Sequence, residues 1–200
     1  MKKQLFLTGV ALVGMSTIGT TTSFAASTPS TTKGVLTFNQ GTLSLDPTQV
    51  PTNLNFGSSA ISYNADTTQV ATTDGGQAST PTTGKMHVED LRGNAAGWTL
   101  KVNQSQFKNS TNAELTGTQL TLTTGQVTNV GGTAPSGGKI NQAVTLIPGT
   151  ETELLKANQT EGNGVSELPI SKFEIKIPAS AAKITGEYSS TITWTLSDTI

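Results

Sequence analysis

Few residues in this chain are of the types that carry catalysis or bind metals. His87 is the only histidine and cysteine is absent, so a zinc site built from several histidines or from thiolates is excluded. A Ser-His-Asp triad would have to use His87, and the sequence has no Gly-x-Ser-x-Gly turn of the kind that presents a nucleophilic serine. We interpret His87 as an imidazole on the surface of a strand.

The acidic residues give no sign of a metal site or of a hydrolase. The Asp-x-Asp-x-Asp-Gly spacing of a calcium loop is absent from the sequence. Glycoside hydrolysis requires two carboxyl groups at a set separation, and the few acidic residues here fall mostly on expected strand surfaces or in loops. We therefore expect no metal and no cofactor, and we expect that the protein is not an enzyme.

One tripeptide occurs twice and is the most distinctive feature of the chain. Trp98-Thr99-Leu100 and Trp194-Thr195-Leu196 lie 96 residues apart. Residues i and i+2 of a strand point to the same face, so each copy places an indole and an isobutyl group together. Either these side chains belong to the core, or one indole keeps an accessible face that stacks on a sugar or on a partner's side chain.

Polar residues beside the tripeptides are further candidates for binding. Asp90 and Arg92 lie two residues apart and can form a charge pair that fixes the turn before Trp98; alternatively, they make a polar contact to a glycan or a partner. If both indoles are buried, the contact surface must lie beside them. That surface would be formed by the flanking loops or by Thr99, Lys101, Thr193 and Thr195.

The segments that must position these residues have the pattern of short strands. Apolar and polar residues alternate most clearly at residues 98–103, 119–123, 172–177 and 191–196. Shorter strands are expected at 35–38, 43–45, 54–56 and 61–63, and loops at 66–84, 131–138 and 158–164. We predict an all-β domain, a β-sandwich or a related Greek-key-like arrangement, with the two Trp-Thr-Leu strands adjacent in one sheet.

The amino terminus predicts export. A basic start precedes an apolar run over residues 5–15, and Ala25 ends a polar stretch with the small-residue spacing that signal peptidase prefers. The apolar run is shorter than the roughly 20 residues that span a bilayer, so we expect no membrane insertion after cleavage. The expected organisation is a signal peptide at 1–25, a Ser/Thr/Pro-rich lead-in at 26–33 and one β domain at 34–200.

Charge and composition narrow the partners and the compartment. Removal of Lys2 and Lys3 with the signal leaves ten basic and 13 acidic residues, a net charge of −3, which gives no electrostatic reason to expect nucleic acid. A secreted chain without cysteine is stabilised by burial instead of disulfides. Together with the signal, this composition indicates a Gram-positive-type bacterial exterior.

With their flanking residues, the two tripeptides resemble the WxL domain of Gram-positive cell-surface proteins. The segments that carry the resemblance are Val88–Gly93, Gly97–Val102, Gly186–Tyr188 and Thr193–Asp198. Leu54–Gly57 also fits the family, and the resemblance covers nearly the whole mature chain, as in a small stand-alone member. One departure is that the family usually closes the second motif with a proline, whereas this chain ends Asp198-Thr199-Ile200.

The resemblance implies non-covalent attachment to the cell wall, through peptidoglycan or another wall polymer, and association with co-encoded surface proteins. Its motif residues are Trp98, Leu100, Trp194 and Leu196. Residues 146–150 have a composition similar to that of a sortase signal, but the residues are in the wrong order and lie in mid-chain. This agrees with attachment by non-covalent contacts alone. The alternative is an interaction subunit of a surface complex or an adhesin, which binds a membrane-anchored companion or a host matrix protein.

Overall fold

The computed structural model describes residues 30–198, and the chain divides into two units, residues 1–37 and 38–200. In the first unit, residues 30–37 form neither a helix nor a strand, and their side chains are exposed. The expected signal peptide at 1–25, the first half of the lead-in and the last two residues of the chain lie outside the described residues.

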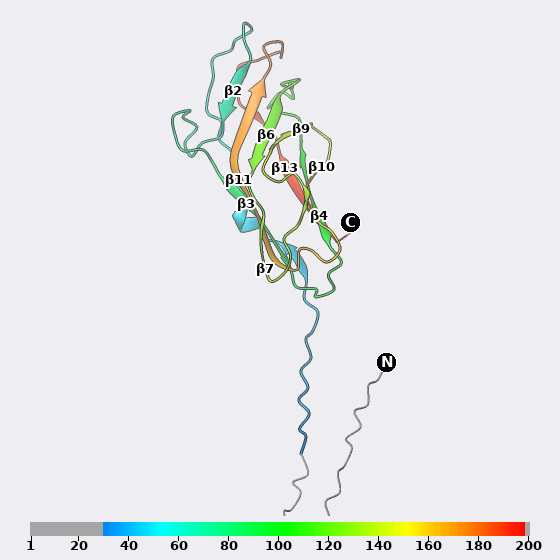
Figure 1. Ribbon diagram of the computed structural model, residues 1–200. Helices are drawn as coiled ribbons and strands as arrows, with labels where there is room; N and C mark the ends of the chain where they lie inside the picture. Colours follow the sequence, from blue (N-terminus) through cyan, green and yellow to red (C-terminus); the bar gives the residue numbers. More distant parts are fainter. Residues whose placement is uncertain (1–29, 199–200) are drawn as a thin grey trace, which may run out of the picture. The chain divides into compact units, whose positions relative to one another are not determined.

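The second unit is built from antiparallel strands in two main sheets (Figure 1). The larger sheet contains β1 (Leu43–Leu45), β2 (Thr67–Val70), β3 (Gly84–Asp90), β6 (Gln119–Thr124), β7 (Thr128–Val130), β9 (Ala143–Leu146) and β11 (Gly164–Ile177). The smaller sheet contains β4 (Trp98–Gln104), β8 (Gly137–Gly138), β10 (Thr152–Ala157) and β13 (Ile192–Ser197). A short ribbon pairs β5 (Lys108–Asn109) with β12 (Tyr188–Ser189), and η1 (Pro47–Gln49) is a single 3-10 turn.

β11 is the long central strand of the larger sheet, with β3 and β2 along one edge and β7 and β6 along the other. Its register with β6 shifts between Ile170 and Lys172, so the strand carries a bulge at Ser171. The extra residue changes the parity of the strand, and apolar residues on both sides of the bulge therefore face the core: Leu168 and Ile170 before it, Phe173 and Ile175 after it.

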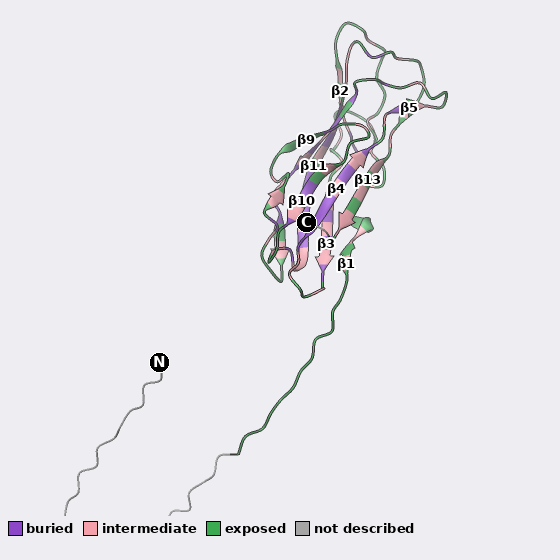
Figure 2. Cartoon of the chain, turned by 90° about the vertical axis from the view of Figure 1, so that its right-hand side faces the viewer, coloured by how far each residue is buried: buried purple, intermediate pink, exposed green. Residues whose placement is uncertain are grey.

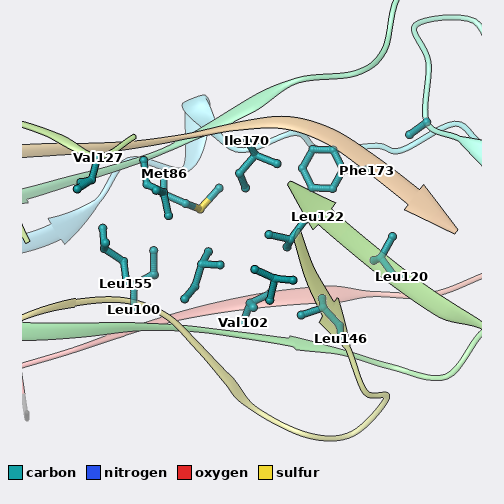
Figure 3. Packing of buried hydrophobic residues seen from close by; sticks show 14 of the residues in the cluster. Met86, Leu100, Val102, Leu120, Leu122, Val127, Leu146, Leu155, Ile170 and Phe173 are labelled. Atoms are coloured by element: carbon teal, nitrogen blue, oxygen red, sulfur yellow. The ribbon is translucent and has the colours of Figure 1, made fainter. Parts of the chain in front are cut away.

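The facing sides of the two sheets share one apolar core, which confirms the predicted all-β sandwich-like domain. Met86, Ile170 and Phe173 of the larger sheet point toward Leu100 and Val102 of β4 (Figure 3). All five side chains are at most 1% exposed. Because the chain has no disulfide, burial of this apolar surface is the main source of its stability.

The predictions of two short strands, at residues 35–38 and 61–63, are wrong. Residues 35–38 form no strand, and Val35, Leu36 and Phe38 are 79%, 79% and 88% exposed. Residues 61–63 lie in a loop as well. Alternating apolar residues make a segment competent to form a strand, but a strand exists only where a neighbour supplies backbone partners.

Two other segments are intermediate cases. At residues 54–56 the backbone forms only an isolated bridge, between Asn55 and Thr72. The long loop expected at 66–84 contains β2 at its start, where the sequence shows no more than a weak strand signal around Val70. The strand expected at 43–45 is present as β1.

Candidate functional site

The two Trp-Thr-Leu strands, β4 and β13, are neighbours and pair antiparallel, as predicted. Leu100 lies opposite Leu196, whereas Trp194 lies opposite Val102. Val102 lies four positions after Trp98, so the backbone positions of the two tryptophans are about 13 Å apart along the strand direction. The leucines therefore form a cross-strand pair that lies between the two indoles, with Trp194 in the middle of the shared ladder and Trp98 just beyond its end.

Trp98 is a core residue. Its side chain is 0% exposed, and the indole Nε1 donates a hydrogen bond to the carbonyl oxygen of Gly162 at 3.2 Å. Gly162 has a φ of +75°, and a Cβ added there would lie 2.5 Å from the indole nitrogen. The loop between β10 and β11 therefore closes over Trp98 because residue 162 lacks a side chain. Neither Trp98 nor the fully buried Leu100 is accessible to a ligand.

Asp90 and Arg92 form the charge pair expected at the turn before Trp98. Arg92 donates through Nε and Nη2 to the two carboxylate oxygens at 2.9 and 2.8 Å, and Nη2 also donates to the Gly97 carbonyl at 2.8 Å. The two side chains are 0% and 11% exposed, Asp90 being the more buried. This pair joins the end of β3 to the residue that precedes β4.

The electrostatics of this pair follow from its geometry. The hydrogen bonds from Arg92 hold the pKa of Asp90 below its ordinary value, although burial acts in the opposite direction. Asp90 in turn raises the pKa of the Arg92 guanidinium, and Asp198, just beyond β13, adds a smaller effect of the same sign. The charges of Asp90 and Arg92 are thus satisfied within the fold, which favours the structural interpretation of both residues.

Trp194 differs from Trp98 because β13 is an edge strand and Trp194 is only partly buried. Figure 2 shows β13 in the colours of intermediate and exposed residues, whereas β4 is mostly in the colour of buried ones. Trp194 lines a hollow of about 450 Å³, which we call the Trp194 hollow. The apolar wall of this hollow includes Phe56 and Phe107, whose rings meet edge to face with centroids 6.5 Å apart. The polar residues that line it are Thr52, Asn53, Glu187, Tyr188, Ser189, Ser190 and Thr191.

A second and larger hollow, of about 720 Å³, continues from the first. The two share Leu54, Phe56, Phe107, Glu187 and Tyr188. We call the second one the Gln69 hollow, after the β2 residue on its wall. Both segments that accompany the tripeptides in the sequence, Leu54–Gly57 and Gly186–Tyr188, line this hollow.

Two polar atoms on the wall of the Gln69 hollow have no hydrogen-bond partner within residues 30–198. They are Gln69 Oε1 and Thr118 Oγ1, and both atoms are buried. An unpaired buried polar atom costs about 1–3 kcal/mol, so such atoms call for an explanation. A ligand with hydroxyl or amide groups would supply the missing partners after a small side-chain rotation, while the aromatic wall would contact its apolar surface.

The segment 54–57 is held in place by local geometry. The Gly57 amide donates to Asn55 Oδ1 at 2.9 Å, which makes a tight turn after Phe56. Gly57 has a φ of +75°, and a Cβ there would lie 2.0 Å from the Gly75 carbonyl oxygen. Only glycine fits this position. The turn fixes the backbone that carries Phe56 onto the wall of both hollows.

The outer face of the β4–β13 pair is polar. Thr193 and Thr195 are exposed, and Lys101 forms an ion pair with Glu151 at 3.3 Å between Nζ and Oε2. Thr99, which was grouped with them from the sequence, is only 4% exposed. This face offers hydroxyl groups, and the aromatic residues of β4 and β13 lie on the opposite face of these strands.

His87 lies on the outer side of β3. Its Nδ1 is 2.9 Å from Glu167 Oε1, and Lys85 Nζ contacts the same oxygen at 2.6 Å. Hydrogen bonds from Lys85 and then His87 lower the pKa of Glu167. Within residues 30–198, no cluster of three or more His, Asp or Glu side chains could hold a metal ion. No helix in the same range has the length and hydropathy needed to cross a membrane.

The structure therefore separates the six residues that the sequence singles out. Trp98, Leu100, Asp90 and Arg92 belong to the interior and to the turn that enters β4, whereas Trp194 and Leu196 are partly exposed on the edge strand. The residues that sequence reasoning missed are on the walls of the hollows: Phe107, Gln69 and Thr118. Nothing in their local sequence marks them, because segments distant along the chain bring them together.

Comparison with known proteins identifies the family. The family model described as "WxL domain surface cell wall-binding" matches residues 25–199. No curated protein and no solved structure matches the chain. The match spans nearly the whole sequence and contains both tripeptides. The chain therefore belongs to the WxL domain family of surface, cell wall-binding proteins.

Proposed function

We propose that this protein is held non-covalently on the outside of a Gram-positive cell wall, and that the polymer it binds is peptidoglycan. The family match supports binding to the wall. The observation that carries the location is the Gln69 hollow, where an aromatic wall meets two buried polar atoms without protein partners. In this proposal, a stretch of glycan strand occupies that hollow.

The chemistry of the hollow agrees with that of a wall glycan. A sugar ring has apolar C–H faces, which stack on aromatic side chains such as Phe56, Phe107 and Tyr188. The hydroxyl and acetamido groups of amino sugars can donate to Gln69 Oε1 and Thr118 Oγ1. The volume of about 720 Å³ lies within the range of small-ligand sites, about 300–1,000 Å³.

The motif residues then have two roles. Trp98, Leu100, Asp90 and Arg92 are positioning residues that hold β4 in the core and thereby place β13. Trp194 and Leu196 contribute to the accessible edge beside the hollows. We infer that residues 1–25 direct secretion and are removed, and that the mature protein is not an enzyme.

Co-sedimentation with purified peptidoglycan, from which other wall polymers have been removed, tests the proposal. Thr118→Val removes one unpaired oxygen and keeps the side-chain shape, so the fold should be kept or stabilised. We expect this variant to bind about 5- to 10-fold more weakly, the value of about one hydrogen bond. Thr123→Val, on the outer side of β6 and away from the hollow, is the matched control and should bind like the wild type.

Salt dependence is a second readout of the same proposal. Because stacking and neutral hydrogen bonds dominate the contact, binding should change little as ionic strength rises. Failure of the wild-type protein to pellet above a control β-protein would contradict wall binding. Equal binding by Thr118→Val and the wild type would instead place the polymer elsewhere on the surface.

A second candidate function is that of an interaction subunit that binds a co-encoded surface protein or a host matrix protein. The observation that favours it is the edge strand β13, which pairs with β4 on one side and, within residues 30–198, with no strand on the other. Capture of such a protein, together with no binding to bare peptidoglycan, would favour this candidate over the first.

A further inference from the structure

The free edge of β13 presents the backbone of the second tripeptide. The Ser105 amide donates to the Thr191 carbonyl at 2.9 Å, while the Gln104 carbonyl accepts from Gly149 on the opposite side of β4. Backbone groups alternate in direction along an antiparallel ladder. It follows that the N–H and C=O groups of Ile192, Trp194 and Leu196 point away from β4, toward the unpaired edge.

The side chains next to this edge are apolar. Ile192, Trp194 and Leu196 pack partly against the core, and the first two also line the Trp194 hollow. A strand added here would find backbone partners and, on the same side, an apolar surface for every second residue. An edge with these properties is a site for pairing with another strand unless the protein blocks it.

The same chain contains a segment of strand-forming residues that belongs to no strand of the structure. Residues 35–38 alternate with Leu36 and Phe38 on one side, and their side chains are 79% and 88% exposed. Residues 30–40 are assigned to no strand. Two large apolar side chains are thus left in water beside strong strand-forming residues, which is unfavourable unless a partner covers them.

We propose that residues 34–40 of a second copy of this chain add to β13 as an antiparallel strand, with Phe38 opposite Trp194 and Leu36 opposite Leu196. Every strand pair in the two sheets is antiparallel, so this orientation continues the smaller sheet in its own pattern. Directly opposite residues share a face, so the register places Leu36 and Phe38 on the apolar side. It also brings Lys33 of the incoming chain near the exposed Asp198.

The proposed interface is heterologous, because residues 34–40 of one copy contact the β13 edge of another. Such a contact generates open chains of molecules or closed rings, and a reciprocal exchange of tails generates a dimer. The inference does not depend on peptidoglycan binding, because it uses the backbone edge of β13 and the side chains of Ile192, Trp194 and Leu196, none of which lines the Gln69 hollow where the glycan is placed.

Sedimentation velocity of the purified chain over a wide concentration range tests the inference. We expect concentration-dependent association in the wild type. Leu36→Asp and Phe38→Asp should each weaken it by about ten-fold or more, because a charge replaces a buried apolar side chain. Val35→Asp is the matched control: Val35 is as exposed as Leu36, at 79%, but would face away from the apolar side, so association should be nearly unchanged. All three residues are exposed, so none of the variants should unfold the domain.

Hydrogen exchange and a peptide complete the test. At concentrations where the chain associates, the amides of Trp194 and Leu196 should exchange more slowly than in the Leu36→Asp variant. A synthetic peptide of residues 33–41 added to that variant should restore the slow exchange. A chain that stays monomeric would overturn the inference, whether those amides exchange fast or are protected by the chain's own tail. Equal effects of Leu36→Asp and Val35→Asp would also overturn it. Pelleting of Leu36→Asp with peptidoglycan should be unchanged, so the two proposals can fail separately.

Discussion

Replacement of each motif tryptophan by alanine should have very different consequences for stability. Trp98 lies on β4, which has neighbours on both sides, and is 0% exposed. Trp194 lies on the edge strand and is only partly buried. The same tripeptide therefore has two different environments, and Trp98→Ala should be the more destabilising of the two changes.

The magnitudes follow from burial. Removal of a fully buried tryptophan side chain costs about 3–5 kcal/mol, and the Gly162 carbonyl also loses its hydrogen bond from the indole, which adds about 1 kcal/mol. For Trp194, roughly half of the transfer term is at stake, about 1–2 kcal/mol. We therefore expect the free energy of unfolding to fall by about 4–6 kcal/mol in Trp98→Ala.

Equilibrium urea unfolding, followed by circular dichroism, measures both values. With a denaturant slope of about 2 kcal/mol per molar, the midpoint should move by about 2–3 M in Trp98→Ala and by about 1 M or less in Trp194→Ala. Trp98→Phe, which keeps most of the ring volume but loses the N–H donor, should lie between the wild type and Trp98→Ala. Equal midpoints for the two alanine variants would refute the burial assignment.

Three further predictions concern the surroundings of these residues. Gly162→Ala should destabilise the fold by about 1–3 kcal/mol more than Gly93→Ala. Both glycines have positive φ, but only a Cβ at residue 162 would contact the indole of Trp98. Urea unfolding of the two variants measures this difference. Asp90→Asn should be less stable than the wild type at neutral pH. Since the folded pKa of Asp90 is lowered, its contribution is present above the ordinary value of 3.8 and lost as pH falls through the folded pKa, so the two stability curves should converge in acid. In single-tryptophan variants, acrylamide should quench the fluorescence of Trp194 (Trp98→Phe) more than that of Trp98 (Trp194→Phe), and equal quenching would speak against their different exposure.

Much of the fold could be predicted because alternation reports directly on which strands have one buried face. This holds for β4, β6, β13 and the second half of β11. It fails at residues 35–38, where the residue types favour a strand but the structure forms none. The pattern of side chains shows that a segment can form a strand. Whether it pairs in a sheet depends on contacts with residues that are distant in the sequence.

The candidate site was harder to predict for the same physical reason. The two identical tripeptides differ in exposure because β4 is a central strand and β13 is an edge strand. The order of strands in a sheet cannot be predicted from the local sequence pattern. The Gln69 hollow is assembled from segments around residues 54–61, 107 and 183–188, with Thr118 on its wall. Only Leu54–Gly57 and Gly186–Tyr188 carried a signal, through their resemblance to the family.

The two copies of a Trp-x-Leu motif in a domain of a wall-binding family invite the view that the tryptophans themselves touch the ligand. Here Trp98 is sealed in the core by a loop that requires a glycine, and the charge pair of Asp90 with Arg92 anchors the turn before it. These residues determine where β13 lies. In the proposed function, wall binding depends on the first tripeptide through the position of β13, and the proposed contacts lie on the adjacent aromatic walls.

Titration of the isotopically labelled protein with soluble peptidoglycan fragments, followed by backbone amide chemical shifts, tests the proposed binding site most directly. We expect saturable shifts centred on Gln69, Thr118 and Tyr188, with much smaller changes at Thr193 and Thr195 on the outer face of the smaller sheet. Shifts confined to that outer face, or none at fragment concentrations that saturate binding to whole peptidoglycan, would contradict the placement of the glycan in the Gln69 hollow.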